Sequence, residues 1–299
     1  MTTQETLDKQ ESMYTWGTLA IVVLALIAGY WNTLERVVSH WDDPRYSHGW
    51  LIPAFTLVLL WMRREPLKRV SISARWAGAG VICAALLLRL AATYFPFITI
   101  DMVSFVPAVV GAVLLCGGWS MLRWGAAPVA FLLFMFPLPM FMDRILLNPL
   151  QRIATVCGTF SLQTMGVGAY RDGNRISIGQ EFQLGVVDAC AGLRMLTIFV
   201  AMSVAIVLVI DRPLWQRIAI IASSFPIAIL VNVIRITVTA LLYLMNYGEL
   251  ADHLVHDWAG YLMMPLALGF LYLEMQLLSR VLIEEEDGPP VPLVMGSGA

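Results

Sequence analysis

Apolar residues occur along most of the chain in long runs, which short polar stretches separate. A helix of about 20 residues crosses a hydrocarbon layer of about 30 Å, and about eight of the runs approach that length. They are residues 15–33, 48–62, 76–95, 101–118, 127–143, 189–210, 217–245 and 256–282. The pattern therefore predicts an all-α polytopic membrane protein with about eight transmembrane helices.

One stretch, residues 144–188, mixes polar residues with glycine and contains no spanning run. Residues 150–165 repeat apolar positions with helical period, which predicts an amphipathic helix against the outer membrane surface. Alternating residues around Asp172-Gly173 and Gly179-Gln180 then predict a short β-hairpin or meander. We expect this segment to be a small extracytoplasmic insert in a single transmembrane domain of residues 1–283.

The composition supports a membrane protein, with 59% hydrophobic and 13% charged residues and a mean hydropathy of +0.75. The expected partner is the lipid bilayer, and no nucleic-acid partner is expected. The segment Met1 to Tyr14 is polar and mixed in charge, so the first helix is predicted to stay as an anchor. The acidic, proline-rich residues 284–299 are predicted to be a disordered tail.

The distribution of basic residues predicts the orientation. With both termini in the cytoplasm, ten basic residues would face the cytoplasm and six the other side. The ten are Lys9, Arg63, Arg64, Lys68, Arg69, Arg75, Arg123, Arg212, Arg217 and Arg280, and the six are Arg36, Arg45, Arg144, Arg152, Arg171 and Arg175. Arg89 lies inside a span and is interpreted as an arginine that reaches toward the headgroups.

The four cysteines show no paired spacing, so free thiols are expected instead of disulfides or a CxxC metal site. Cys83, Cys116 and Cys157 are interpreted as small apolar residues. Cys190 differs because it lies where a predicted strand meets a predicted helix, with Asp188 two residues before it. The helix N-terminus and Arg194, one turn further on, both favour its thiolate.

Cys190, Arg235 and His256 are expected to meet at the outer membrane surface. Cys190 and His256 each begin a span on that side, and Arg235 lies eighteen residues beyond Arg217, or about 27 Å along a helix. Thiol, guanidinium and imidazole supply a nucleophile, an anion stabiliser and a proton carrier. Arg194 is the rival anion stabiliser.

Several further residues are assigned supporting roles. Asn232, one turn before Arg235, is expected to hold that guanidinium. His253 and His256 share a helix face, but the carboxylates of Asp252 and Asp257 do not complete a zinc pattern, so no metal is expected. His256 is preferred as acid and base because Gly260 leaves space beside it.

Two segments are candidates for contact with a substrate. Tyr46, Ser47 and His48 precede the second span, where they either belong to an aromatic belt or line the outer site. Gly192 keeps the face of its helix beside Cys190 open to a peptide backbone.

An ordered set of motifs from Asp43 to Pro265 resembles the exosortase family. The set is Tyr-Ser-His-Gly, Phe-Pro-Leu-Pro, Asn-Pro-Leu-Gln, the Gly173 to Leu184 meander, Asp-Ala-Cys-Ala-Gly-Leu-Arg, Asn-x-x-Arg and His-Asp-x-x-Gly. The chain departs from the frequent pattern at Ala191, where relatives often carry serine.

The resemblance implies a bacterial inner-membrane cysteine protease or transpeptidase without a cofactor. Its substrates would carry a C-terminal Pro-Glu-Pro (PEP-CTERM) type motif, one transmembrane helix and a basic tail, and such enzymes cooperate with exopolysaccharide systems. Catalytic roles carry over to Cys190, Arg235 and His256. Whether an amine or water accepts the acyl group stays open.

Two other function classes fit parts of the sequence. A membrane transporter would use Arg235 and His256 as a proton or anion path. A non-catalytic component of extracellular polysaccharide export would need neither Cys190 nor its thiolate.

Overall fold

The computed structural model describes residues 3–43, 46–65, 69–95, 97–178, 182–185, 192–210, 212–253 and 259–281. In β3 and at some helix ends only the backbone path is described. The described chain is almost entirely helical, with one small antiparallel sheet. This confirms the predicted helical membrane protein.

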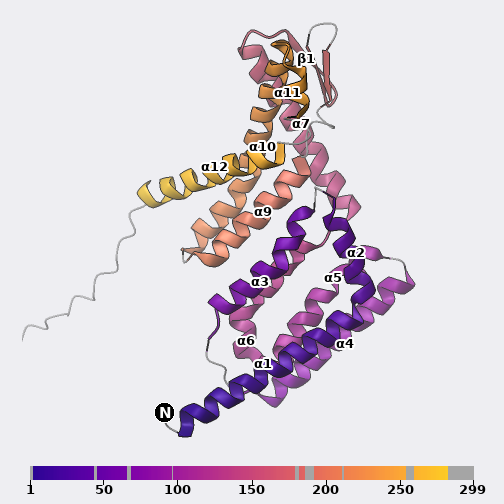
Figure 1. The fold of residues 1–299 in the computed structure, drawn as a ribbon, viewed down its shortest axis with the longest axis vertical. Helices are drawn as coiled ribbons and strands as arrows, with labels where there is room; N and C mark the ends of the chain where they lie inside the picture. Colours follow the sequence, from indigo (N-terminus) through magenta and orange to yellow (C-terminus); the bar gives the residue numbers. More distant parts are fainter. Residues whose placement is uncertain are drawn as a thin grey trace, which may run out of the picture.

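The first half of the chain is a helical bundle, in the lower part of Figure 1. Its elements are α1 (Thr3–Gly29), α2 (Trp31–Trp41), η1 (Ser47–Trp50), α3 (Leu51–Met62), α4 (Ile72–Tyr94), α5 (Ile98–Val103), α6 (Phe105–Phe131) and η2 (Leu132–Met135). The chain bends by 78° between α1 and α2. The largest apolar core fills this bundle and includes Tyr30, Leu59 and Met121.

The second half carries the sheet and the remaining long helices, in the upper part of Figure 1. Its elements are α7 (Met140–Thr164), β1 (Ala169–Asp172), β2 (Arg175–Ile178), β3 (Phe182–Gly185), α9 (Gly192–Val209), α10 (Leu214–Leu244), α11 (Gly248–His253) and α12 (Ala259–Val281). α9 joins the halves, because Ala201 and Leu208 pack on the first core and Leu196 packs on α10 and α12.

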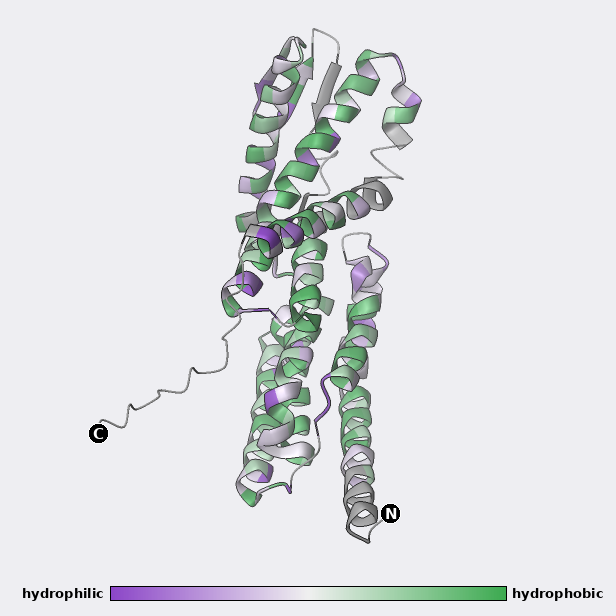
Figure 2. Cartoon of the chain, turned by 90° about the vertical axis from the view of Figure 1, so that its left-hand side faces the viewer, coloured by the Kyte–Doolittle hydropathy of each residue, from purple (hydrophilic) through white to green (hydrophobic). Residues whose placement is uncertain are grey.

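Apolar residues occur along most helices in Figure 2, as a lipid environment favours. Within the described residues, three stretches are long and apolar enough to cross a membrane, namely Ile72–Tyr94, Ile98–Met135 and Leu214–Leu244. The bent pair α1 and α2 makes a fourth when it is taken as one span. Two further apolar helices, Ser47–Met62 and Leu196–Val209, are shorter than these stretches, so the predicted eight spans are not confirmed.

α6 reverses direction at Gly118, whose φ is +69°. A methyl group built on Gly125 would lie 3.9 Å from Cγ1 of Val113, although twelve residues of straight helix extend about 18 Å. The two limbs of α6 are therefore antiparallel, and the turn between them is only a few residues long. Glycine at this turn is favoured because other L-residues rarely adopt a positive φ.

The predicted fifth span, residues 127–143, has the wrong boundaries. The second limb of α6 and η2 end at Met135, and α7 begins at Met140. Pro137 and Pro139 lie in the break, where they lack the N–H groups that would continue the helix. The break at Phe-Pro-Leu-Pro was predicted, whereas the single helix that runs on from Met140 to Thr164 was not.

The insert forms the predicted meander, with strand order β1-β2-β3 and antiparallel pairing of Asp172 with Arg175 and of Ile178 with Phe182. Ile176 and Ile178 pack with Leu162 of α7 and Ile236 of α10. α10 has 31 residues and is therefore about 46 Å long, which exceeds the hydrocarbon thickness. The sheet and α7 cover the C-terminal part of this helix.

Arg89, which the sequence suggested reaches toward the headgroups, has partners within the protein. Its Nε lies 3.4 Å from Oδ1 of Asp101, and its guanidinium lies 4.1 Å from the ring centre of Tyr30. Thr33 donates a hydrogen bond of 2.9 Å to the other Asp101 oxygen, and Arg89 also donates to the carbonyl of Gly29. These bonds tie α4 and α5 to the bend between α1 and α2.

Candidate active site around Arg235

Arg235 is the largest fully buried side chain among the described residues, with 1% of its surface exposed. Its Nη2 donates a hydrogen bond of 2.7 Å to Oδ1 of Asn232, one turn earlier in α10. The hydrogen bond expected from the Asn-x-x-Arg spacing is therefore present. Asn232 is itself buried, so this contact fixes the guanidinium in a site that solvent hardly reaches.

The other donors of Arg235 have no such contact. Nε and Nη1 are buried and have no hydrogen-bond partner in the part of the chain that the structure describes. A buried charged donor without an acceptor costs more than an ordinary unmade hydrogen bond. The arrangement is suited to an anionic or carbonyl oxygen that approaches this side of the guanidinium.

The packing of α10 against α9 and α12 shows the height of Arg235 relative to the start of α9. Val231 of α10 belongs to the same buried cluster as Leu196 of α9 and Ala267 of α12. α9 and α10 are antiparallel neighbours joined by a short turn, so one turn beyond Val231 on α10 corresponds to one turn before Leu196 on α9. Those positions are Arg235 and Gly192, which puts Arg235 within about one turn of the start of α9.

A row of polar side chains, missed from the sequence, lies on α7 beside this part of α10. Gln151, Thr155 and Thr159 are spaced four residues apart and are all buried. Nδ2 of Asn174 in the β1–β2 turn donates to Oε1 of Gln151 at 3.2 Å. Their helical spacing is visible in the sequence, but the sequence does not reveal that this polar face of an amphipathic helix is covered.

Thr239 is a second missed residue near Arg235. It follows Arg235 by one turn on α10, is buried, and its hydroxyl has no hydrogen-bond partner in the described parts of the chain. Asn232, Arg235 and Thr239 therefore form a polar face of α10 within an otherwise apolar helix.

Most of the other predicted site residues lie outside what the structure describes. This holds for Cys190, Asp188, His256 and Asp257, and for the side chains of Arg194 and His253. Gly192 is the first residue of α9, and His253 is the last residue of α11. That Cys190, Arg235 and His256 meet thus stays a prediction.

The Tyr-Ser-His-Gly segment forms η1 and packs on the first bundle. Nε2 of His48 lies 3.1 Å from the carbonyl oxygen of Phe134, and Nε1 of Trp41 donates to the carbonyl of Met135 at 2.8 Å. Tyr46 and His48 are buried, whereas Ser47 is exposed. Contact of these residues with a substrate stays a prediction.

The glycine of that segment has a packing role. A methyl group built on Gly49 would lie 2.2 Å from Nε1 of Trp41, so only glycine fits beneath this indole. Trp50 also packs edge-on against Trp41, with ring centres 5.0 Å apart.

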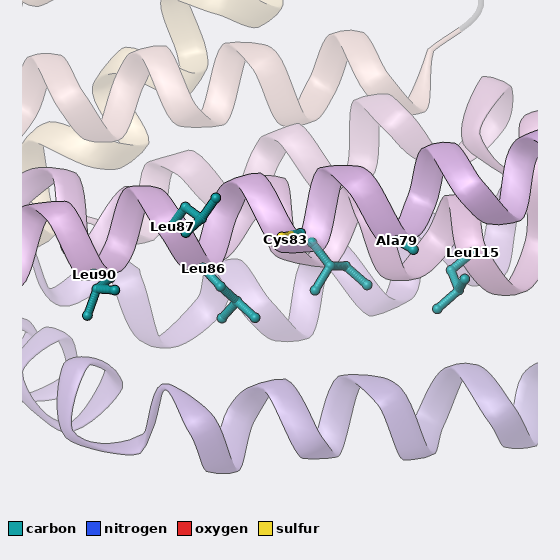
Figure 3. A pocket seen from close by; sticks show the side chains of 7 residues that line it. Ala79, Cys83, Leu86, Leu87, Leu90 and Leu115 are labelled. Atoms are coloured by element: carbon teal, nitrogen blue, oxygen red, sulfur yellow. The ribbon is translucent and has the colours of Figure 1, made fainter.

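An apolar groove of about 410 Å³ lies on α4, where Ala79, Cys83, Leu86 and Leu90 line it together with Leu115 of α6 (Figure 3). Its lining offers no acid, base or charged side chain, so it suits a lipid chain better than a reaction. Cys83 and Cys157 are exposed and Cys116 is half-buried. Among the described residues, no three His, Cys, Asp or Glu side chains gather as a metal site would require.

Comparison with known proteins adds one match. Residues 40–273, which make up more than half of the chain, match the model of a protein family described as transmembrane exosortase. Neither a curated protein nor a solved structure matches the chain.

Proposed function

Because the chain belongs to the transmembrane exosortase family, we propose that it is a membrane cysteine protease or transpeptidase that processes C-terminal sorting signals of exported proteins. The substrates would carry a Pro-Glu-Pro type motif before one transmembrane helix and a basic tail. The reaction would take place at the outer face of a bacterial inner membrane, with both termini of the enzyme in the cytoplasm and with about eight spans in total.

The buried guanidinium of Arg235 carries this proposal. It is fixed by Asn232, it has two nitrogen atoms without a partner among the described residues, and it lies within about one turn of the start of α9. Cys190 precedes Gly192 by two residues, so covalent geometry keeps their Cα atoms within about 7 Å of each other. A thiolate attacking a carbonyl in this region would create its oxyanion within reach of the arginine.

The position of His256 is likewise limited by its short separation along the chain from described residues. It lies three residues after His253, the end of α11, and three residues before Ala259, the start of α12. Each separation allows at most about 11 Å between Cα atoms. Since α12 packs beside Leu196 and Val231 through Ala267, its first residues and α11 belong to the same end of the bundle as Arg235.

The proposed reaction has two steps. The Cys190 thiolate forms a bond to the peptide carbonyl carbon, and Arg235 stabilises the tetrahedral oxyanion. As the C–N bond breaks, the His256 imidazolium gives its proton to the departing amine. An amine or water, deprotonated by His256, then attacks the thioester and releases the Cys190 sulfur.

Arg194 is the alternative oxyanion stabiliser, and it would otherwise orient or acidify the thiol. It lies two residues into α9, and the partial positive charge of that helix end acts in the same direction. Replacement separates the two arginines. If Arg235 stabilises the oxyanion, Arg235→Lys loses far more turnover than Arg194→Lys, because a lysine ammonium cannot replace a planar fork that also binds Asn232.

The decisive experiment is co-expression with a protein that bears a Pro-Glu-Pro type C-terminal signal. The mass of the substrate's C-terminus is followed with wild type, Cys190→Ala and Cys83→Ala, the last as a matched cysteine removal in the α4 groove. We expect cleavage with wild type and Cys83→Ala and none with Cys190→Ala. Full processing by Cys190→Ala would remove Cys190 from the mechanism and overturn the proposal.

A further inference from the structure

A second cavity lies at the other end of the bundle from Arg235. It has a volume of about 520 Å³ and opens between the end of α3, the turn from α9 to α10 and the second limb of α6. Arg63, Arg217, Glu65 and Trp124 contribute its polar groups, and Leu59 and Leu208 are among its apolar residues. Arg217 and Arg235 are eighteen residues apart on α10, or about 27 Å, which is close to the thickness of the hydrocarbon layer.

Backbone carbonyls hold both arginines of this cavity in place. Nε and Nη2 of Arg63 donate to the carbonyl of Leu208 at 3.0 and 2.7 Å, and Nε of Arg217 donates to the carbonyl of Arg212 at 2.6 Å. The Arg63 contact caps the last turn of α9, and the Arg217 contact holds the segment between α9 and α10. A guanidinium has five N–H donors, so Arg63 keeps three that the Leu208 carbonyl does not use.

Trp124 is a further polar residue at this cavity. It lines the cavity and is only 6% exposed, yet its indole N–H has no hydrogen-bond partner among the described residues. Buried polar groups in native proteins usually have a partner, so this N–H is suited to donate to an oxygen atom that reaches it. The backbone contacts of the two arginines do not explain this donor.

The surroundings favour an amphiphilic anion. Leu59, Leu208 and Val209 supply apolar walls next to the guanidinium groups. Arg64 follows α3, Arg123 lies just after the reversal of α6 at Gly118 and Arg212 follows α9, so the basic residues in these segments outnumber the acidic residues Glu65 and Asp211. Basic pockets between helices at a membrane boundary are suited to anionic lipid headgroups.

We propose that this cavity binds the phosphodiester headgroup of an anionic phospholipid. Arg63 and Arg217 bind the phosphate oxygens, the Trp124 N–H donates to a glycerol or ester oxygen, and the acyl chains leave along Leu59 and Val209. The lipid joins α3, α6 and the α9–α10 turn at the membrane boundary opposite the candidate active site. This site is independent of the chemistry proposed at Cys190.

The test is native mass spectrometry of the purified, delipidated full-length protein, titrated with phosphatidylglycerol or with phosphatidylcholine. Arg63→Gln and Arg64→Gln form a matched pair, because they are neighbours with the same charge change, and Arg64 instead stacks on Trp61. Trp124→Phe keeps an aromatic ring and removes only the N–H. Size-exclusion chromatography of each variant verifies that it is folded.

We expect saturable binding of phosphatidylglycerol and at least tenfold weaker binding of phosphatidylcholine. Arg63→Gln should weaken the former about tenfold, as loss of a charge-assisted hydrogen bond implies, Trp124→Phe about threefold, and Arg64→Gln less than twofold. Equal losses for the two arginine variants would indicate general surface charge and overturn the proposal. Displacement of the lipid by millimolar inorganic phosphate would assign the cavity to a soluble anion and overturn the lipid assignment.

Discussion

Among the residues that the structure describes, only Asn232 forms a hydrogen bond to the Arg235 side chain. Asn232 accepts the one hydrogen bond that the structure records for this guanidinium, at 2.7 Å and away from bulk water. A displacement of about 1 Å in a group that meets a transition state can cost about a hundredfold in rate. Asn232 is thus a positioning residue in the proposed reaction.

Removing that contact gives the first prediction. Asn232→Ala should lower kcat for signal cleavage about tenfold to hundredfold with little change in KM, because Arg235 loses its orientation and not its charge. Ser224→Ala is the control, since Ser224 is also buried on α10 and its hydroxyl donates to the carbonyl of Ile221 in the same helix. A purely structural role would instead lower thermal stability and leave kcat of the folded fraction unchanged.

Single residues differ in how far the sequence reveals them. Asn232 and Arg235 stand out because two polar residues one turn apart in an apolar helix can form a hydrogen bond to each other. The structure shows this hydrogen bond. The ion pair of Arg89 was not predicted, because its partner Asp101 lies in another helix, where local spacing gives no signal. Thr239 and Gln151 were missed because their burial depends on which elements cover them.

Two helices of the first bundle cross at unusually short distance. A methyl group built on Gly78 of α4 would lie 2.5 Å from the backbone nitrogen of Leu115, and one built on Gly111 of α6 would lie 2.9 Å from the carbonyl oxygen of Gly78. Small residues allow such close contact between membrane helices. The backbone atoms in this contact cannot move aside as a flexible side chain would.

Gly78→Ala should therefore destabilise the protein by about 1–3 kcal/mol through overpacking. Gly80→Ala, two residues away on the same helix, meets nothing within 4 Å and should leave stability unchanged or slightly higher, because alanine favours helix. Thermal unfolding in detergent, followed by tryptophan fluorescence, distinguishes the two. Equal melting temperatures for both variants would show that the crossing tolerates a wider separation.

The Arg89–Asp101 pair joins elements that are far apart in sequence. Asp101→Asn leaves the guanidinium without its counter-charge and should cost about 3 kcal/mol of stability. The double variant Arg89→Gln/Asp101→Asn should cost less than the sum of its two single variants, since each single change leaves the other group unpaired. Arg36→Gln, at an exposed arginine of α2, is the reference, and additive losses would contradict a direct pairing.

At the level of elements, the sequence predicted the meander, the Phe-Pro-Leu-Pro break and the α10 helix well. These depend on local signals, namely turn residues, proline and a long apolar run. The sequence did not predict that residues 140–164 form one helix, α7, because amphipathic and spanning helices have the same period. It also did not predict the reversal of α6 at Gly118, because a reversal needs only two or three residues.

The whole molecule consists of a lower bundle and an upper helical region with the sheet, which α9 connects. Which end faces the cytoplasm follows only from the basic residues, since a count of ten against six favours one orientation. The family match supports a membrane exosortase, and the orientation itself is a proposal.

That orientation gives a direct prediction for intact cells. In a background without the four native cysteines, Cys190 included, Arg171→Cys on the exposed face of β1 should react with a maleimide that cannot cross the inner membrane. Arg64→Cys, at the opposite end of the bundle, should react only after lysis. The reverse labelling pattern would place the sheet in the cytoplasm and exclude an outer active site.

The length of α10 also determines how far Arg235 lies from the membrane boundary at the start of this helix. Leu214 and Arg235 are 21 residues apart, or about 31 Å, so a helix that begins at one boundary of the hydrocarbon brings this guanidinium to the other boundary. The remaining turns of α10 rise above that level and carry the sheet. α10 therefore sets the distance of Arg235 from the opposite membrane boundary. In the proposed substrate, only the peptide bonds next to its own transmembrane helix would lie at the height of Arg235.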